Sequence, residues 1–211
     1  MRDTILFGDC RKTLCGFLPK SARMCVTSPP YYGLRDYGGE ENQIGLEQTP
    51  EEYIKQMVEV FREVRNILTD DGTLWLNIGD SYYNYRPGKG QALVKQSVSK
   101  TKQDLPDKCA KRGNKLEGLK EKDLIGIPWM LAFALRADGW YLRQDIIWNK
   151  PNPMPESVKD RCTKSHEYIF LLSKNKNYFY DNEAIKEPAK DWGTRDRTNG
   201  GGNVISEKLS Y

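Results

Sequence analysis

Apolar side chains recur every three or four positions over residues 49–68, which is the spacing of a helix with one buried face. The apolar positions are Tyr53, Met57, Val60, Phe61, Val64 and Leu68. Thr49 can cap this helix, Pro50 suits its first turn, and Glu52 completes a capping box. We therefore expect an amphipathic helix that ends at Asp70-Asp71-Gly72.

Short runs of β-branched and aromatic residues, several of them closed by glycine or proline, predict the strands. The runs are residues 4–7, 23–27, 73–78, 141–148 and 167–172, with residues 177–180 as a short additional partner. A helical stretch around Leu14 separates the first two runs, and another helix is expected over residues 123–137, broken or started near Pro128. Two strands joined by a helix indicate a parallel βαβ unit, so the pattern predicts an α/β fold.

The chain of 211 residues is long enough for one large α/β unit, which we place at residues 1–188. Residues 189–211 are polar, contain Gly200-Gly201-Gly202 and lack periodicity. We expect this tail to be disordered or to be the start of an interrupted segment.

Residues 86–122 are expected to form a basic loop. The loop contains eleven lysine or arginine residues and four acidic ones, a balance of +7, whereas the whole chain carries +4. Such a stretch can follow the phosphate backbone of a nucleic acid. A solvated loop whose lysines aid solubility would have the same composition, so this alternative stays open.

The composition excludes several classes of protein. Apolar residues make up 38% of the chain, and no stretch approaches the ~20 apolar residues of a membrane span. Residues 1–7 lack the apolar region of a signal peptide, so we expect a cytoplasmic protein. Five widely spaced cysteines and a single histidine, His166, argue against a zinc site and against a disulfide framework. We expect no metal ion.

The run Ser28-Pro29-Pro30-Tyr31 follows a predicted strand and is the main candidate for chemistry. Two prolines stiffen the turn, so that the Ser28 hydroxyl and the Pro29 carbonyl become fixed acceptors beside the Tyr31 ring. The exocyclic amine of a base is a poor nucleophile, and acceptors aimed at its N–H groups would localise its lone pair for an in-line methyl transfer. Such a base must leave the duplex, and Tyr31 is the candidate for the ring on which it stacks. An ordinary extended turn with a surface tyrosine is the alternative.

Four blocks of the chain, taken in order, resemble the bacterial and phage DNA methyltransferases that modify N4 of cytosine or N6 of adenine. The blocks are residues 27–37, 72–81, 145–153 and 166–170. The resemblance covers most of residues 4–188 and implies a Rossmann-like, doubly wound, mostly parallel sheet. It also implies S-adenosyl-L-methionine as the methyl donor and double-stranded DNA as the partner.

The resemblance implies roles for individual residues. The implied roles are catalysis for Ser28, Pro29, Pro30 and Tyr31, donor binding for Asp9, Thr27 and Asp80, and DNA contact for Arg35, Lys89, Lys111, Arg112 and Lys150. Three alternatives stay open. They are a plain turn at Gly8-Asp9, capping of the strand's turn by Asp80 and Ser81, and support of the core by Lys150 and His166-Glu167.

The order of the blocks is that of the permuted class of these enzymes, in which a Phe-x-Gly-x-Gly turn follows the catalytic half. Nothing after Pro188 fits that turn, so we expect a truncated or split gene product, whose donor-binding segment is missing or is supplied by another chain. Ser28 in place of aspartate favours cytosine N4 over adenine N6. A DNA-binding fragment without activity of its own, and a methylase of RNA or protein, are the other readings.

Overall fold

The computed structural model describes residues 3–36, 43–83, 96–97, 116 and 118–188. The chain divides into two compact units, Met1–Phe179 and Tyr180–Tyr211, and all described helices and strands lie in the first. Its helices are α1 (Cys10–Leu14), α2 (Pro50–Ile67) and α3 (Ile127–Ala137). Its strands are β1 (Ala22–Thr27), β2 (Arg35–Asp36), β3 (Leu68–Ile78), β4 (Gln96–Ser97), β5 (Tyr141–Asn149) and β6 (His166–Ser173). The expected division after residue 188 stays a prediction.

The main sheet has four strands in the order β1-β3-β6-β5. β1 and β3 run parallel because α2 crosses between them, whereas β6 is antiparallel to both β3 and β5. The expected α/β class is therefore confirmed, but the described sheet is mixed rather than mostly parallel. The reason is the direct loop over residues 150–165, which returns the chain from β5 to β6 without a helix.

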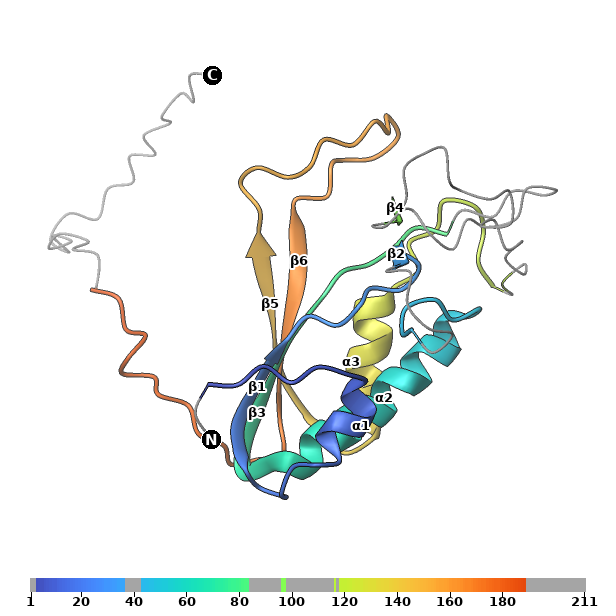
Figure 1. Ribbon diagram of the computed structural model, residues 1–211. Coiled ribbons are helices and arrows are strands. Elements are labelled where there is room, and N and C mark those ends of the chain that lie inside the picture. Colours follow the sequence, from blue (N-terminus) through green and yellow to red (C-terminus); the bar gives the residue numbers. More distant parts are fainter. Residues whose placement is uncertain (1–2, 37–42, 84–95, 98–115, 117, 189–211) are drawn as a thin grey trace, which may run out of the picture. The chain divides into compact units, whose positions relative to one another are not determined.

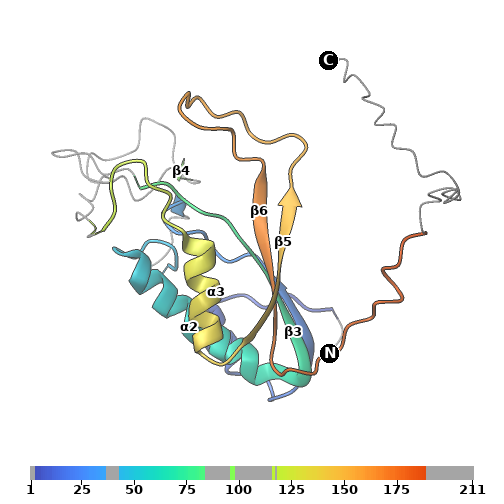
Figure 2. The same ribbon diagram turned by 180° about the vertical axis from the view of Figure 1, so that it is seen from behind.

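The helices α2 and α3 lie on one side of this sheet, as both views of the ribbon show (Figures 1 and 2). The apolar face of α2 and the inward residues of β3 and β6 form the core, in which Phe61, Leu76 and Phe170 are almost fully buried. Trp129 of α3 packs edge-on against Phe170. The sheet is thus anchored through one face.

No described helix covers the opposite face of the sheet (Figure 2), and apolar side chains on that face are exposed. Val26 and Trp75 are paired across β1 and β3, and Val26 is 69% exposed. Trp148 of β5 is 56% exposed. This open face is continuous with the end of β1, where the Ser-Pro-Pro-Tyr run begins.

The first predicted strand, at residues 4–7, is wrong. This segment pairs with no described strand, and its side chains are exposed, with Ile5 at 80% and Phe7 at 91%. β-Branched composition alone does not make a strand, and this segment does not pair with either edge strand of the main sheet, β1 or β5. The parallel unit is β1–α2–β3 instead, and the additional partner expected at residues 177–180 is also not a strand.

The capping box predicted for α2 is confirmed. The Thr49 hydroxyl accepts from the Glu52 amide at 3.2 Å, and the Glu52 carboxylate accepts from the Thr49 amide at 3.3 Å. The predicted end of the helix is wrong by a few residues, because β3 begins at Leu68 and includes Asp70-Asp71-Gly72. The predicted start of α3 near Pro128 is confirmed.

No helix in the described part of the chain combines the length and the apolar character needed to cross a bilayer.

Candidate active site

The Ser-Pro-Pro-Tyr run lies where three strands of the main sheet meet. It directly follows β1, whose last residue Thr27 is paired with Leu76 of β3. The next residue of β3, Asn77, is paired with Ile169 of β6, and Glu167 lies near the start of that antiparallel strand. The register therefore places the end of β1, the end of β3 and the start of β6 next to one another, at the same end of the sheet.

At this end of the sheet the side chains of Ser28 and Tyr31 both form hydrogen bonds with Asn77. The Ser28 hydroxyl donates to Asn77 Oδ1 at 3.2 Å, and the Tyr31 hydroxyl lies 2.9 Å from the same oxygen. The Tyr31 hydroxyl also lies 3.1 Å from Glu167 Oε2, and its single proton can serve one of these acceptors at a time. The Ser28 hydroxyl also lies 3.4 Å from the Tyr31 hydroxyl, so its single proton serves either Asn77 or Tyr31, and in both cases the lone pairs of the Ser28 oxygen can accept.

Glu167 is the charged centre of this network. Its Oε2 accepts from Asn77 Nδ2 at 3.3 Å, and its Oε1 forms an ion pair with Lys150. Burial alone would raise the pKa of Glu167, but the hydrogen bonds from Lys150, Asn77 and Tyr31 lower it below its ordinary value. The carboxylate is therefore charged at neutral pH and holds the amide of Asn77 in one orientation.

The ring of Tyr31 is held against the backbone of Gly79. A Cβ atom built at Gly79 would lie 2.5 Å from Tyr31 Cε2, so only glycine leaves room for the ring. Burial, together with the nearby charge of Glu167, raises the pKa of the Tyr31 hydroxyl to about 12 despite the opposing bond from Ser28. Tyr31 is neutral in the physiological range, and Tyr53 secures the same turn by donating to the Pro30 carbonyl at 2.9 Å.

Ser28 is exposed and Tyr31 is half-buried, so the corner is not sealed inside the core. The sequence did not single out Asn77, and it left Glu167 between DNA contact and core support. The available signal was a polar residue at position 77 between two apolar ones near the end of a predicted strand.

Two of the residues predicted to bind the donor have structural partners. Asp80 accepts from the backbone amides of Gly126 and Ile127, at 3.0 and 3.1 Å, and so caps the start of α3. Asp9 caps α1 and forms an ion pair with Arg11 at 2.8 Å. The alternative of capping the strand's turn is met by the Ser81 amide, which donates to Asp80 at 2.9 Å, whereas capping of α1 by Asp9 and of α3 by Asp80 was not predicted. The donor-binding roles of Asp9, Thr27 and Asp80 stay predictions.

The predicted DNA contacts divide into described and undescribed residues. Arg35 lies in β2 and is exposed, and Lys150 is bound to Glu167. Lys89, Lys111 and Arg112, like most of the basic loop at 86–122, lie outside the described residues. Within the described part of the chain, no group of three or more His, Cys, Asp or Glu residues is arranged to hold a metal ion.

Replacing Glu167 by glutamine is expected to lower the free energy of unfolding by roughly 1 kcal/mol near neutral pH, because Lys150 loses its charged acceptor. The folded-state pKa of Glu167 is lowered, so this stabilisation is complete above the unfolded pKa of about 4.3 and is lost as the pH falls through the folded value. Urea titrations from neutral to acidic pH should show the two proteins converging. Glu59→Gln, on the exposed side of α2, is the matched control. A gap of constant size at all pH values would exclude the carboxylate as its source.

A mixed α/β sheet with a proline-stiffened polar corner at a strand end gives this chain a Rossmann-like α/β fold. Residues 22–209 match the model of the N6/N4 type of DNA methylase. Because this match covers more than half of the chain, the chain belongs to that DNA methylase family.

Type II methyltransferase M.SmaI of Serratia marcescens is 56% identical to the chain over 192 residues. The aligned part covers 89% of this chain and 61% of that relative. The chain spans about three fifths of the length of the curated relatives that it matches first.

Two solved structures share the fold. The PvuII DNA methyltransferase, named as cytosine-N4-specific, superposes with a TM-score of 0.55 at 18% identity and covers 82% of this chain and 50% of that one. A candidate DNA modification methylase of Thermus thermophilus, solved in complex with S-adenosyl-L-methionine, has a TM-score of 0.51 at 21% identity and covers 87% of this chain and 55% of that one. These similarities confirm the predicted Rossmann-like methyltransferase fold.

Proposed function

We propose that this chain carries the base-binding half of a type II DNA methyltransferase, which transfers a methyl group from S-adenosyl-L-methionine to N4 of a cytosine turned out of double-stranded DNA. The observation that carries this proposal is the Ser28 and Tyr31 pair at the end of β1, fixed by Asn77 and Glu167. Membership of the DNA methylase family supports the same reaction.

The residues of the chain would act by positioning the amine. The Ser28 oxygen, whose proton is shared between Asn77 and Tyr31 as acceptors, can accept an N–H of the exocyclic amine and so favour a localised lone pair. The Tyr31 ring, held against Gly79, would stack on the base, and its neutral hydroxyl stays bound to the network. When the nitrogen gains the methyl group it must lose one proton, which would pass along the hydrogen bond to an acceptor of this corner and from there to water.

The donor supplies an electrophilic methyl group on a sulfonium. The described residues do not fit it on their own, because Asp80 and Asp9 already have partners within the chain. We therefore propose no step that passes through these carboxylates. The same observation favours a second candidate function, in which the chain binds DNA and another chain completes the donor site.

The choice of base rests on Ser28, since serine before Pro-Pro-Tyr is the pattern that resembles the cytosine-N4 enzymes. Methylation of adenine N6 is the alternative within the same reaction class. The two products differ chemically, so one experiment separates them.

The chain is incubated with duplex DNA and labelled donor, once alone and once together with a chain that supplies the donor-binding segment, and the DNA is digested to nucleosides. The second mixture is expected to give N4-methylcytosine. Ser28→Ala should slow the transfer about tenfold or more while DNA affinity is kept, since one acceptor of the amine is removed. Ser21→Ala, an exposed serine just before β1, is the matched control. N6-methyladenine as the product would overturn the choice of base. DNA binding without any labelled product would favour the second candidate function.

A further inference from the structure

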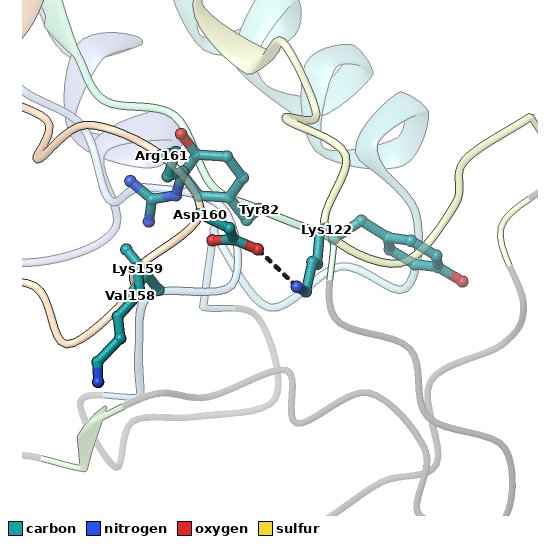
Figure 3. Close-up of a pocket in the computed structure, with 7 residues that line it drawn as sticks. Tyr82, Lys122, Val158, Lys159, Asp160 and Arg161 are labelled. Atoms are coloured by element: carbon teal, nitrogen blue, oxygen red, sulfur yellow. Dashed lines mark hydrogen bonds and ion pairs between the residues drawn. The ribbon is translucent and has the colours of Figure 1, made fainter.

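A second feature near the site is a cavity of about 730 Å³ that the network around Glu167 does not include. It lies between the chain after β3, the turn before α3 and the loop that joins β5 to β6 (Figure 3). The lining residues are Tyr82, Tyr83, Lys122, Val158, Lys159, Asp160 and Arg161. The walls thus combine aromatic rings with charged groups.

The charge of the cavity wall is predominantly positive, because three cations face one carboxylate among the described lining residues. Lys122 bonds to Asp160 at 2.6 Å, whereas Lys159 is exposed and has no ion pair within the described part of the chain. Figure 3 shows Lys159 projecting away from the Lys122–Asp160 pair. One cation of the wall is therefore available for an anionic ligand without breaking an existing bond.

The third cation, Arg161, is preorganised by its neighbours. Its guanidinium carbon lies 4.0 Å from the centre of the Tyr82 ring, and the group is paired with Glu156. Stacking on a ring fixes the plane of a guanidinium, which lowers the entropic cost of binding a phosphate through its N–H groups. Tyr82 and Arg161 thus form a rigid wall beside the exposed Lys159.

The cavity and the Ser28–Tyr31 corner are linked through the chain after β3, because Ser81, the neighbour of the cavity residue Tyr82, donates to the Tyr32 carbonyl at 2.9 Å. Lys164 lies in the loop between the cavity residues and Glu167. Burial lowers its pKa, the carboxylates of Asp80 and Glu167 oppose that shift, and Arg161 adds to it. Lys164 therefore lies within electrostatic reach of both a cavity residue, Arg161, and the centre of the network, Glu167. When one nucleotide of a DNA strand enters the network, the backbone of the neighbouring nucleotide can contact the cavity.

We propose that this cavity binds a phosphate of the DNA backbone next to the nucleotide whose base enters the site, with Lys159 as its principal cation. The inference rests on the proposed function and adds to it a contact surface formed by residues 158–161. Phosphate contacts of this kind fix the position of the duplex without reading its sequence, and each neutralised phosphate releases a counterion.

The test compares Lys159→Gln with the unchanged chain for binding to a fluorescently labelled DNA duplex at increasing salt. The plot of log affinity against log salt is expected to become less steep by about one unit for Lys159→Gln, with weaker binding at low salt. Lys176→Gln, an exposed lysine in the turn after β6, is the matched control and should keep the original slope. An unchanged slope in Lys159→Gln would overturn the proposal.

A second variant acts in the opposite direction. Asp160→Asn removes the carboxylate from the described wall and frees Lys122, so it should tighten DNA binding at low salt. Weaker binding by this variant would contradict a phosphate site. Loss of binding to a free nucleoside monophosphate in Lys159→Gln, without loss of duplex binding, would assign the cavity to a free nucleotide and overturn the proposal as well.

The outcomes also separate this inference from the proposed function. A chain that methylates DNA but shows no dependence of the slope on Lys159 overturns the inference alone. A chain that transfers no methyl group but loses one unit of slope in Lys159→Gln overturns the proposed function alone.

Discussion

Phe170→Ala is expected to lower the free energy of unfolding by about 3–5 kcal/mol, because the ring is completely buried and its removal leaves a cavity. Phe170 lies on β6, next to the central strand β3, and contacts Trp129 of α3. It therefore joins the sheet to the helical layer at the middle of the core. Urea denaturation followed by circular dichroism measures the change.

Ile169→Ala is the matched control for this prediction, since residue 169 is the preceding position of β6 and points to the open face. The side chain is partly exposed, so its truncation should cost less than half as much as that of Phe170. Equal losses for the two variants would mean that both faces of the sheet are covered to the same extent, against the one-sided arrangement of α2 and α3.

Gly79→Ala is expected to reduce methyl transfer roughly ten- to a hundredfold, the equivalent of losing a stacking contact of about 1–3 kcal/mol. The new methyl group would overlap the Tyr31 ring, with only 2.5 Å between carbon atoms, and the ring must leave its position. The prediction depends on the proposed function, so the measurement is kcat/KM with duplex DNA and labelled donor.

Gly16→Ala serves as the control for Gly79→Ala, because Gly16 lies in the turn after α1 and a Cβ there approaches the Thr13 carbonyl, at 3.3 Å, and not the Tyr31 ring. Its activity should match that of the unchanged chain. Full activity in Gly79→Ala would show that the observed position of the Tyr31 ring is not needed for the reaction.

The elements that the sequence predicted best are those decided by local chemistry. The Thr49 and Glu52 capping box needs only four consecutive residues, and the buried face of α2 is encoded within its own length. The strand before Ser28 was predicted correctly because prolines end it. The family followed from the Ser-Pro-Pro-Tyr run and three further blocks, and the family match confirms it.

The features that the sequence did not predict depend on pairing between distant segments. The direction of β6 follows from a helix-free loop, which short apolar runs do not encode. Asn77 and Glu167 are 90 positions apart and meet only because β3 and β6 pair antiparallel. The prediction of a strand at residues 4–7 was wrong for the converse reason. Its composition suits a strand, but it pairs with no described strand.

The end of β3 places stability and chemistry on alternate residues of one strand. Leu76 and Ile78 point into the core, while Asn77 between them points to Ser28 and Tyr31. The irregular stretch of β3 after Leu68 ends before this alternation begins, and from Thr73 to Leu76 β3 stays in continuous register with both β1 and β6. A slip by one position would exchange the two sides, exposing apolar side chains and burying the amide. The register of β3 therefore determines both the packing of the core and the position of Asn77. A change in that register would alter the core and the Ser28–Tyr31 corner together.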